Sequence, residues 1–164
     1  MPVMEGLEVY RSPVHGYGIR TTRPFEKGAT LIYGDGVLFH EDDDFDDEYA
    51  LIVPAYDETG KEIPSMYWDL ACQSRWINHS CDPNTEVDTK FSEDGKRVIA
   101  WWTALRDIPV GEELAYDYSF SGHLAIPCHC KAALCRGLIV DPDEADLIPE
   151  QYKHLFKQAT KLAV

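Results

Sequence analysis

One stretch of this chain decides its fold: Ser74-Arg75-Trp76-Ile77-Asn78-His79-Ser80-Cys81-Asp82-Pro83-Asn84. Its second half combines two asparagines, a histidine, a serine and a cysteine with one proline. Polar groups at this density need hydrogen-bond partners when they are buried, so neither a plain core strand nor an amphipathic helix fits. Pro83 restricts Asp82 to extended or turn geometry. The stretch therefore predicts either a polar surface turn or a bend that directs side chains at a ligand.

Three cysteines lie close together near the C-terminus, at positions 128, 130 and 135. Structural zinc is usually held by four ligands in a tetrahedron, and cysteine thiolates are common among them. The spacing therefore favours a metal site over three unliganded buried thiols. The residues alone do not choose the fourth ligand, for which the candidates are Cys72, Cys81, His123 and His129.

Aromatic residues alternate with other residues at Tyr116, Tyr118 and Phe120. In an extended segment these three side chains lie on one face. A row of aromatic rings with two hydroxyls can line a channel for an ammonium or methylammonium group through cation–π attraction. The same row can form an aromatic ridge of the core. Both interpretations remain open for this segment in isolation.

The composition indicates a soluble globular chain of one domain. Of its 164 residues 45% are hydrophobic, and the mean hydropathy is -0.32. Since there is no run of 18 apolar residues, we expect no membrane span and no membrane partner. The first eleven residues lack the basic flank and apolar segment of a signal peptide. Five cysteines fit free thiols better than a secreted disulfide framework, so we expect an intracellular, reducing compartment, the cytoplasm or the nucleus.

The chain is strongly acidic, with a net charge of -14 and a pI of about 4.7. Such a chain is poorly suited to grip nucleic acid through phosphates, so no direct nucleic-acid partner is expected. It suits a basic peptide, although acidity also serves solubility alone. Seven of the eight residues from Glu41 to Glu48 are acidic. This run predicts either a solvated loop or an electrostatic attraction for a cationic segment.

Short strand-like segments with frequent turns make up most of the chain: 7–11, 19–22, 29–33, 37–40, 49–53, 85–91 and 97–105. Asp94-Gly95 between the last two is a hairpin signal. Trp101 and Trp102 point to opposite faces of the last segment, so we expect both faces to be buried. No βαβ rhythm appears, which excludes a doubly wound sheet and favours a mostly β, α+β fold.

A single helix is expected, beginning after Pro149. Apolar residues recur there at i, i+3, i+4 and i+7, namely Tyr152, Leu155, Phe156 and Ala159. This spacing is typical of one buried face of an α-helix.

Four motifs occur along the chain in a fixed order. They are Gly16-Tyr17-Gly18, the stretch from Arg75 to Asn84, Gly111-Glu112-Glu113-Leu114-Ala115-Tyr116-Asp117-Tyr118, and Cys128-x-Cys130-x4-Cys135-Arg136-Gly137. In this order they resemble the motifs of the SET-domain protein lysine methyltransferases, including the post-SET zinc motif. The resemblance covers about residues 7 to 140.

The resemblance implies a SET fold of small sheets, in which the central and last motifs form a knot-like crossing beside the active site. It implies a SET domain over residues 5–120 and a zinc-binding post-SET segment over residues 121–140. Residues 141–164 would then form a C-terminal helical extension.

The resemblance also implies roles for single residues. Tyr118 matches the catalytic tyrosine, and Tyr116 stands where family members carry Tyr or Phe and where the number of added methyl groups is influenced. S-adenosyl-L-methionine would lie near His15, Gly16, Tyr17, Arg75, Asn78 and His79. Zn²⁺ would be structural and held by Cys81, Cys128, Cys130 and Cys135.

The function implied is transfer of methyl groups from S-adenosylmethionine to a lysine of a basic protein or peptide, with a histone tail as one candidate. Two alternatives belong to other classes. One is a catalytically silent module that binds basic peptides, which the intact Asn78, His79 and Tyr118 argue against. The other is a small zinc-stabilised interaction protein, which would transfer no methyl group.

Overall fold

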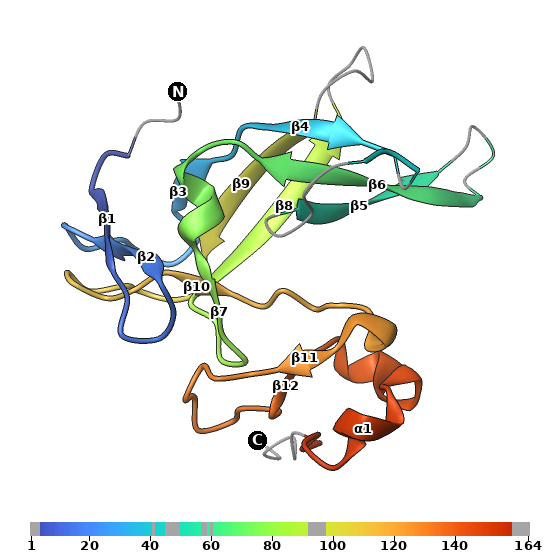
Figure 1. Ribbon diagram of the computed structural model, residues 1–164. Coiled ribbons are helices and arrows are strands. Elements are labelled where there is room, and N and C mark those ends of the chain that lie inside the picture. The colour runs from blue at the N-terminus through green and yellow to red at the C-terminus, as the bar shows by residue number, and fades with distance from the viewer. Residues whose placement is uncertain are drawn as a thin grey trace.

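The computed structural model describes residues 4–40, 42–44, 50–56, 59, 61–91 and 98–158. Its strands form five small sheets rather than one large one, and only short helices occur among the described residues (Figure 1). This confirms the mostly β, α+β fold. Most of the acidic run, namely Glu41 and residues 45–48, lies outside the described residues, while Asp42, Asp43 and Asp44 are exposed.

Two three-stranded sheets make up the larger part of the molecule. One has the order β3-β9-β8, with β3 at Thr30–Tyr33, β8 at Thr85–Phe91 and β9 at Val98–Ala104. The other has the order β4-β6-β5, with β4 at Gly36–Phe39, β5 at Ala50–Tyr56 and β6 at Glu62–Leu70. The expected hairpin is confirmed by the antiparallel pairing of β8 with β9, although Asp94-Gly95 itself lies outside the described residues.

The main core lies where these sheets meet the antiparallel pair β1 (Leu7–Arg11) and β2 (Tyr17–Thr21). Alternation along β9 explains its position, because Val98, Ala100, Trp102 and Ala104 are all buried. The expectation that both faces of this strand are buried was wrong. On the other face Trp101 is only partly buried and Ile99 is 37% exposed.

A second core follows in the chain. The pair β11 (Ile126–Pro127) and β12 (Leu138–Ile139) packs with the 3-10 helices η2 (Gly122–Leu124) and η3 (Pro142–Leu147). Ala125, Leu138, Val140 and Ile148 form its buried centre, and Figure 1 shows this part below the main sheets.

The C-terminal helix is much shorter than its apolar periodicity predicted. Helix α1 spans only Glu150–Lys153 and is followed by a turn at His154 and Leu155. Leu155 and Phe156 pack on the second core from outside the helix, and the amide of Lys157 donates to the Arg136 carbonyl at 2.8 Å. Ala159 lies outside the described residues. The apolar positions are therefore satisfied by docking on the second core rather than by a longer helix.

Two segments far apart in sequence lie side by side between the two cores (Figure 1). Strand β7 (Asn78–His79) pairs in parallel with β10 (Ala115–Tyr116). The 3-10 helix η1 (Gln73–Trp76) leads into β7. The Asn84 side chain fixes the pairing, since it donates to the Glu113 carbonyl and accepts from the Ala115 amide. This pairing is the crossing of central and last motifs that the resemblance implies.

Among the residues that the structure describes, no helix has both the length and the apolar character needed to cross a membrane.

Candidate active site and metal centre

The parallel pairing of β7 with β10 places Tyr118 beside His79. The His79 Nδ1 accepts from the Tyr118 amide at 3.1 Å, and the Tyr118 hydroxyl donates to the Ile77 carbonyl at 2.8 Å. Both ends of this tyrosine are therefore tied to the central motif. Its ring is held in a defined place by backbone geometry rather than by loop contacts.

A cavity of about 590 Å³ opens beside this tyrosine. Its size falls in the range of small-molecule sites. All six residues predicted to bind the cofactor line it, namely His15, Gly16, Tyr17, Arg75, Asn78 and His79. Tyr118 and Phe120 line it as well, together with residues 126–130 and Ile139 from the part of the chain that holds the second core. The cavity thus lies between two separately packed parts of the chain.

The first motif forms the outer rim of the cavity. Gly16 has a φ of +48°, a conformation that side chains with a Cβ rarely adopt, and this lets the chain turn between β1 and β2. The Tyr17 ring contacts Trp76 with 5.3 Å between ring centroids. Trp76 was not predicted as a site residue, but it lines the same cavity.

The aromatic row predicted at positions 116, 118 and 120 is present. Ring centroids are 4.7 Å apart for Tyr116 and Tyr118, and 5.6 Å apart for Tyr118 and Phe120. Tyr118 and Phe120 line the cavity, whereas Tyr116 is only 6% exposed and packs edge-on against Trp102. Burial raises the pKa of Tyr116 well above its ordinary value, so this hydroxyl stays protonated. The row is therefore part core and part cavity wall.

Four cysteine sulfurs come together at the far side of the site. The Sγ atoms of Cys81, Cys128, Cys130 and Cys135 all lie within 4.8 Å of one another. Sulfur atoms around a tetrahedral zinc with Zn–S bonds of about 2.3 Å would be roughly 3.8 Å apart. The Cys81 and Cys128 sulfurs are 3.8 Å apart, far beyond a disulfide bond. The donor set and its spacing fit zinc. Cys72, by contrast, contacts Ser74 and the amide of Asp35.

The thiols differ in their tendency to ionise. Burial raises the pKa of Cys81 to about 11 and raises the pKa of Cys128 well above its usual value. Burial also opposes ionisation of Cys130, but backbone and thiol hydrogen bonds lower its pKa to about 7. Four thiolates in one place need a compensating cation, which a divalent metal supplies.

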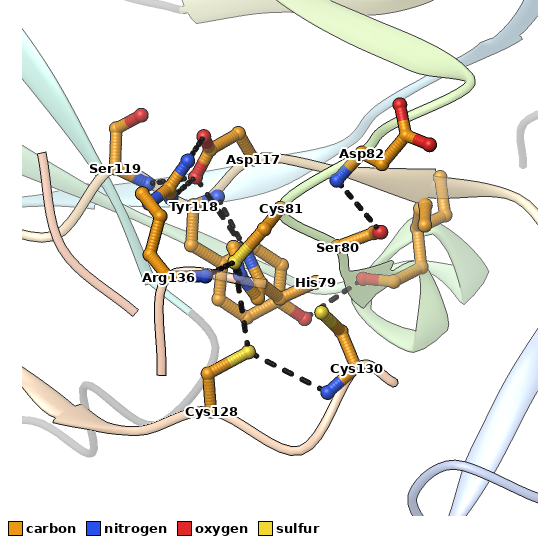
Figure 2. A network of polar contacts seen from close by, with 12 residues as sticks. His79, Ser80, Cys81, Asp82, Asp117, Tyr118, Ser119, Cys128, Cys130 and Arg136 are labelled. Atoms are coloured by element: carbon orange, nitrogen blue, oxygen red, sulfur yellow. Dashed lines mark hydrogen bonds and ion pairs between the residues drawn. The ribbon is translucent and has the colours of Figure 1, made fainter. Parts of the chain in front are cut away.

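A buried ion pair connects the cysteine cluster to the aromatic row (Figure 2). Both terminal nitrogens of Arg136 bond the Asp117 carboxylate at 2.7 Å, and the Arg136 side chain is only 7% exposed. The Arg136 amide also donates to the Cys81 sulfur at 3.4 Å. Sequence reasoning quoted Arg136 and Asp117 in its motifs but gave neither a role. The sequence feature that could have indicated these roles is the position of the two residues: the arginine directly follows a predicted metal ligand, and the aspartate directly precedes Tyr118.

His79 completes this connection as a neutral ring. Burial lowers its pKa to about 4, because the nearby Asp117 carboxylate does not offset the desolvation. With Nδ1 accepting from the Tyr118 amide, Nε2 carries the proton and faces the Cys81 sulfur at 3.4 Å. The 3.6 Å approach of Asp117 to Nδ1 is therefore not an ion pair near neutral pH.

The predicted site residues thus fall into three neighbouring groups. The six predicted cofactor residues and Tyr118 line the cavity, the four predicted metal ligands form the cysteine cluster, and Tyr116 is buried behind Tyr118. Cys128 and Cys130 belong to both the cluster and the cavity wall.

Comparison with known proteins gives the same picture. The family model described as SET domain matches residues 16–119. The chain is 33% identical over 148 residues to the histone-lysine N-methyltransferase ash1 of Drosophila melanogaster, covering 84% of this chain and 6% of that protein. It is 30% identical over 162 residues to an H3 lysine-36 specific histone-lysine N-methyltransferase of Eremothecium gossypii, covering 89% of this chain and 22% of that protein. The chain spans less than a quarter of either relative's length.

Solved structures are similar over 81% of the chain. SUVH6 of Arabidopsis thaliana in complex with SAM matches with a TM-score of 0.68 at 26% identity, over 33% of that chain. KRYPTONITE in complex with mCHH DNA, an H3(1-15) peptide and SAH matches with a TM-score of 0.64 at 25% identity, over 29% of that chain. The motifs, the small sheets and the matched family model agree, and the chain belongs to the SET-domain family.

Proposed function

We propose that this chain transfers methyl groups from S-adenosyl-L-methionine to a lysine side chain of a basic protein or peptide, with a histone tail as the first candidate. One observation carries the proposal: Asn78, His79 and Tyr118 lie together in one cavity wall, on or beside two paired strands. The relatives named histone-lysine methyltransferases and the neighbours bound to SAM or an H3 peptide support it.

The cavity residues would divide the work between them. The bound cofactor supplies an electrophilic methyl group on a sulfonium. His15, Gly16, Tyr17, Arg75, Asn78 and His79 would hold the cofactor. Tyr118, tied at its hydroxyl and at its backbone amide, would orient the lysine amine for direct attack. Fixed geometry of this kind contributes up to about 7–11 kcal/mol to a reaction of two bound groups.

The lysine amine must be neutral before it can attack. A channel walled by Tyr118 and Phe120 is apolar, and removal from water lowers the pKa of an amine. The same aromatic faces hold methylated ammonium products through cation–π attraction. Weak C–H···O contacts from backbone carbonyls would steady the transferred methyl group.

We assign structural Zn²⁺ to Cys81, Cys128, Cys130 and Cys135. We also assign residues 5–120 to the SET domain, 121–140 to the post-SET segment and 141–164 to a C-terminal extension. The separation of the two hydrophobic cores supports a boundary near residue 120. In this arrangement zinc would hold the second core against the cavity, since Cys81 is the one ligand that comes from the central motif.

The net charge of -14 and the exposed Asp42, Asp43 and Asp44 support a basic partner over a nucleic acid. None of the five cysteines forms a disulfide bond, and four of them are the assigned zinc ligands, which supports an intracellular, reducing compartment.

Radiolabelled methyl transfer onto core histones and onto a whole-cell extract, followed by mapping of the modified residue, tests the function. Failure to bind S-adenosylmethionine in calorimetry would instead favour a silent peptide-binding module.

Tyr118→Phe is expected to lower the transfer rate at least about 10-fold, equivalent to about 1.4 kcal/mol of transition-state stabilisation. The change removes the hydroxyl that bonds the Ile77 carbonyl and leaves the ring in place. Affinity for S-adenosylmethionine should change little. Initial rates and calorimetry on the same preparation measure the two effects, and near-native turnover would refute the role of Tyr118.

Tyr116→Phe is expected to shift the product from mainly monomethyllysine towards di- and trimethyllysine while activity is retained. The Tyr116 hydroxyl stays protonated beside Tyr118, and by the resemblance it would hold a water next to the lysine nitrogen. Without the hydroxyl that water loses a partner, so a methyl group can take its place. Mass spectrometry of the product peptide decides the question. Mainly trimethyllysine from the native chain at initial rates would overturn the assignment.

A further inference from the structure

The Glu113 carboxylate accepts hydrogen bonds from three side chains. They are the Tyr10 hydroxyl of β1, the Ser12 hydroxyl just after β1 at 2.9 Å and the Asn78 amide nitrogen of β7 at 2.7 Å. Burial and the Glu113 contact raise the pKa of Tyr10 to about 12, so its hydroxyl remains a donor. The carboxylate thus joins the last motif to the central motif and to the end of β1.

Space for this carboxylate depends on Gly18. A Cβ at position 18 would lie 2.4 Å from Glu113 Oε1 and 3.1 Å from the Ser12 Cβ. Gly18 has no positive φ that would require glycine, so steric room is the reason a glycine fits here. The second glycine of the first motif is therefore needed to leave room for the Glu113 side chain, and not for the geometry of a turn.

The contacts around Asn78 fix which way its amide points. Its nitrogen faces three acceptors: Glu113 Oε1, the Tyr17 carbonyl at 2.9 Å and the His15 carbonyl at 3.4 Å. An amide nitrogen donates and cannot accept, so this orientation is the one that satisfies all three. The amide oxygen is turned away from them, and among the described residues no hydrogen bond to it is found. Asn78 lines the cavity, so it offers that cavity an acceptor.

We propose that Glu113 is a positioning residue for cofactor binding, which orients the Asn78 amide so that its oxygen faces the cofactor and its nitrogen does not. The inference rests on the proposed function, because it takes S-adenosylmethionine as the occupant of the cavity. Glu113 does not line the cavity; it contacts the lining residue Asn78 directly, and through Ser12 it is linked to Val14, whose amide donates to the Ser12 hydroxyl oxygen.

The carboxylate suits this task better than a neutral amide. Two oxygens accept from Tyr10, Ser12 and Asn78 together, and hydrogen bonds to a charged group are stronger than neutral ones. Tyr10 bonds one carboxylate oxygen, Oε2, and Asn78 bonds the other, Oε1, so the single oxygen of a glutamine cannot reach both. Where the glutamine NH₂ group faces Asn78, two donors meet, which favours rotation of the Asn78 amide by half a turn.

Calorimetric titration with S-adenosylhomocysteine tests the proposal on native chain, Glu113→Gln and Glu112→Gln. Glu112→Gln is the matched control, since it removes the same charge one residue away, from a carboxylate that pairs with Arg106 and Asn84. We expect Glu113→Gln to weaken binding about 10-fold or more and the control to change it less than about 2-fold. With excess S-adenosylmethionine the transfer rate of Glu113→Gln should recover, whereas its KM for the cofactor stays raised.

Tyr10→Phe provides a second variant, which keeps Glu113 and removes one of its donors. Ser12 is left in place, because its hydroxyl oxygen also accepts from the Val14 amide in the cavity wall. The variant should weaken S-adenosylhomocysteine binding about 3-fold or more. Thermal melts with zinc present show whether each variant is folded. Native affinity in the folded Glu113→Gln chain would overturn the inference, as would equal losses in the two glutamine variants. No binding by the native chain would contradict the proposed function instead.

Discussion

Cys128→Ser is expected to remove bound zinc from the chain and to lower its thermal midpoint by at least about 10 °C. Cys128 is one of two ligands, the other being Cys130, that belong to both the cysteine cluster and the cavity wall. Its amide also donates to the Gly137 carbonyl at 3.0 Å, and this bond joins the residue just after β11 to the residue just before β12.

The physical reason is the small size of the second core. Among the described residues, its buried part consists of four side chains, Ala125, Leu138, Val140 and Ile148. A core of this size stabilises little on its own, and small units of this kind depend on metals. Zinc bound to four thiolates couples directly to folding, since the unfolded chain does not hold the ligands together.

Elemental analysis and thermal melts of native and variant chains measure the two effects, with and without a strong chelator. Cys72→Ser is the matched control, because Cys72 contacts Ser74 and Asp35 rather than the cluster. It should keep one zinc per chain and the native midpoint. A native zinc content in Cys128→Ser, or loss of zinc in Cys72→Ser, would show that the ligands are assigned incorrectly.

Arg136→Met is expected to lower the free energy of unfolding by about 3 kcal/mol, as is typical when one partner of a buried ion pair is removed. The substitution keeps much of the side-chain volume but leaves the Asp117 carboxylate without its two bonds at 2.7 Å. Burial opposes ionisation of Asp117, yet the Arg136 hydrogen bonds hold its pKa below the usual value. The transfer rate should fall too, because Asp117 precedes Tyr118.

Denaturant unfolding of Arg136→Met, Asp117→Asn and the double variant forms a cycle that isolates the pair. The double variant should be less destabilised than the sum of the two single ones, since it leaves no buried charge.

The pH dependence of the stability that Asp117 contributes has a defined sign. Because the pKa of Asp117 is depressed in the folded chain, its contribution is present above the pKa of the unfolded chain. That contribution is lost as the pH falls through the folded pKa. Additive single effects at neutral pH would contradict the coupling.

Local patterns predicted the strands well where alternation is clear. Leu7–Arg11 and Thr85–Phe91 have the bounds expected from sequence. Strand β6, Glu62–Leu70, was not among the predicted strands, because Pro64 within the run reads locally as a break. The apolar positions after Pro149 were wrongly assigned to one long helix, although Tyr152, Leu155 and Phe156 pack, partly buried, against the second core. Their partner, the second core, is not visible in the local sequence.

The candidate site was predicted residue by residue where a motif carries its own chemistry, as with the cysteines and Tyr118. Glu113 and Arg136 were quoted in motifs, but their roles were not predicted. Arg136 lies 19 residues from Asp117, and Glu113 lies 35 residues from Asn78. A charged side chain becomes informative only once its buried partner is known, and pairing at such separations comes from the tertiary fold.

The cavity is walled on one side by the main core and on the other by the zinc-bearing second core. Any ligand that fills it would therefore contact both parts, which the Cys81 site and the Arg136–Asp117 pair also join. Thermodynamic linkage then predicts coupling in both directions: a cofactor in the cavity would raise the affinity of the cluster for zinc, and zinc would raise the affinity for the cofactor by the same factor. A shortage of either one would therefore lower the affinity of this chain for the other.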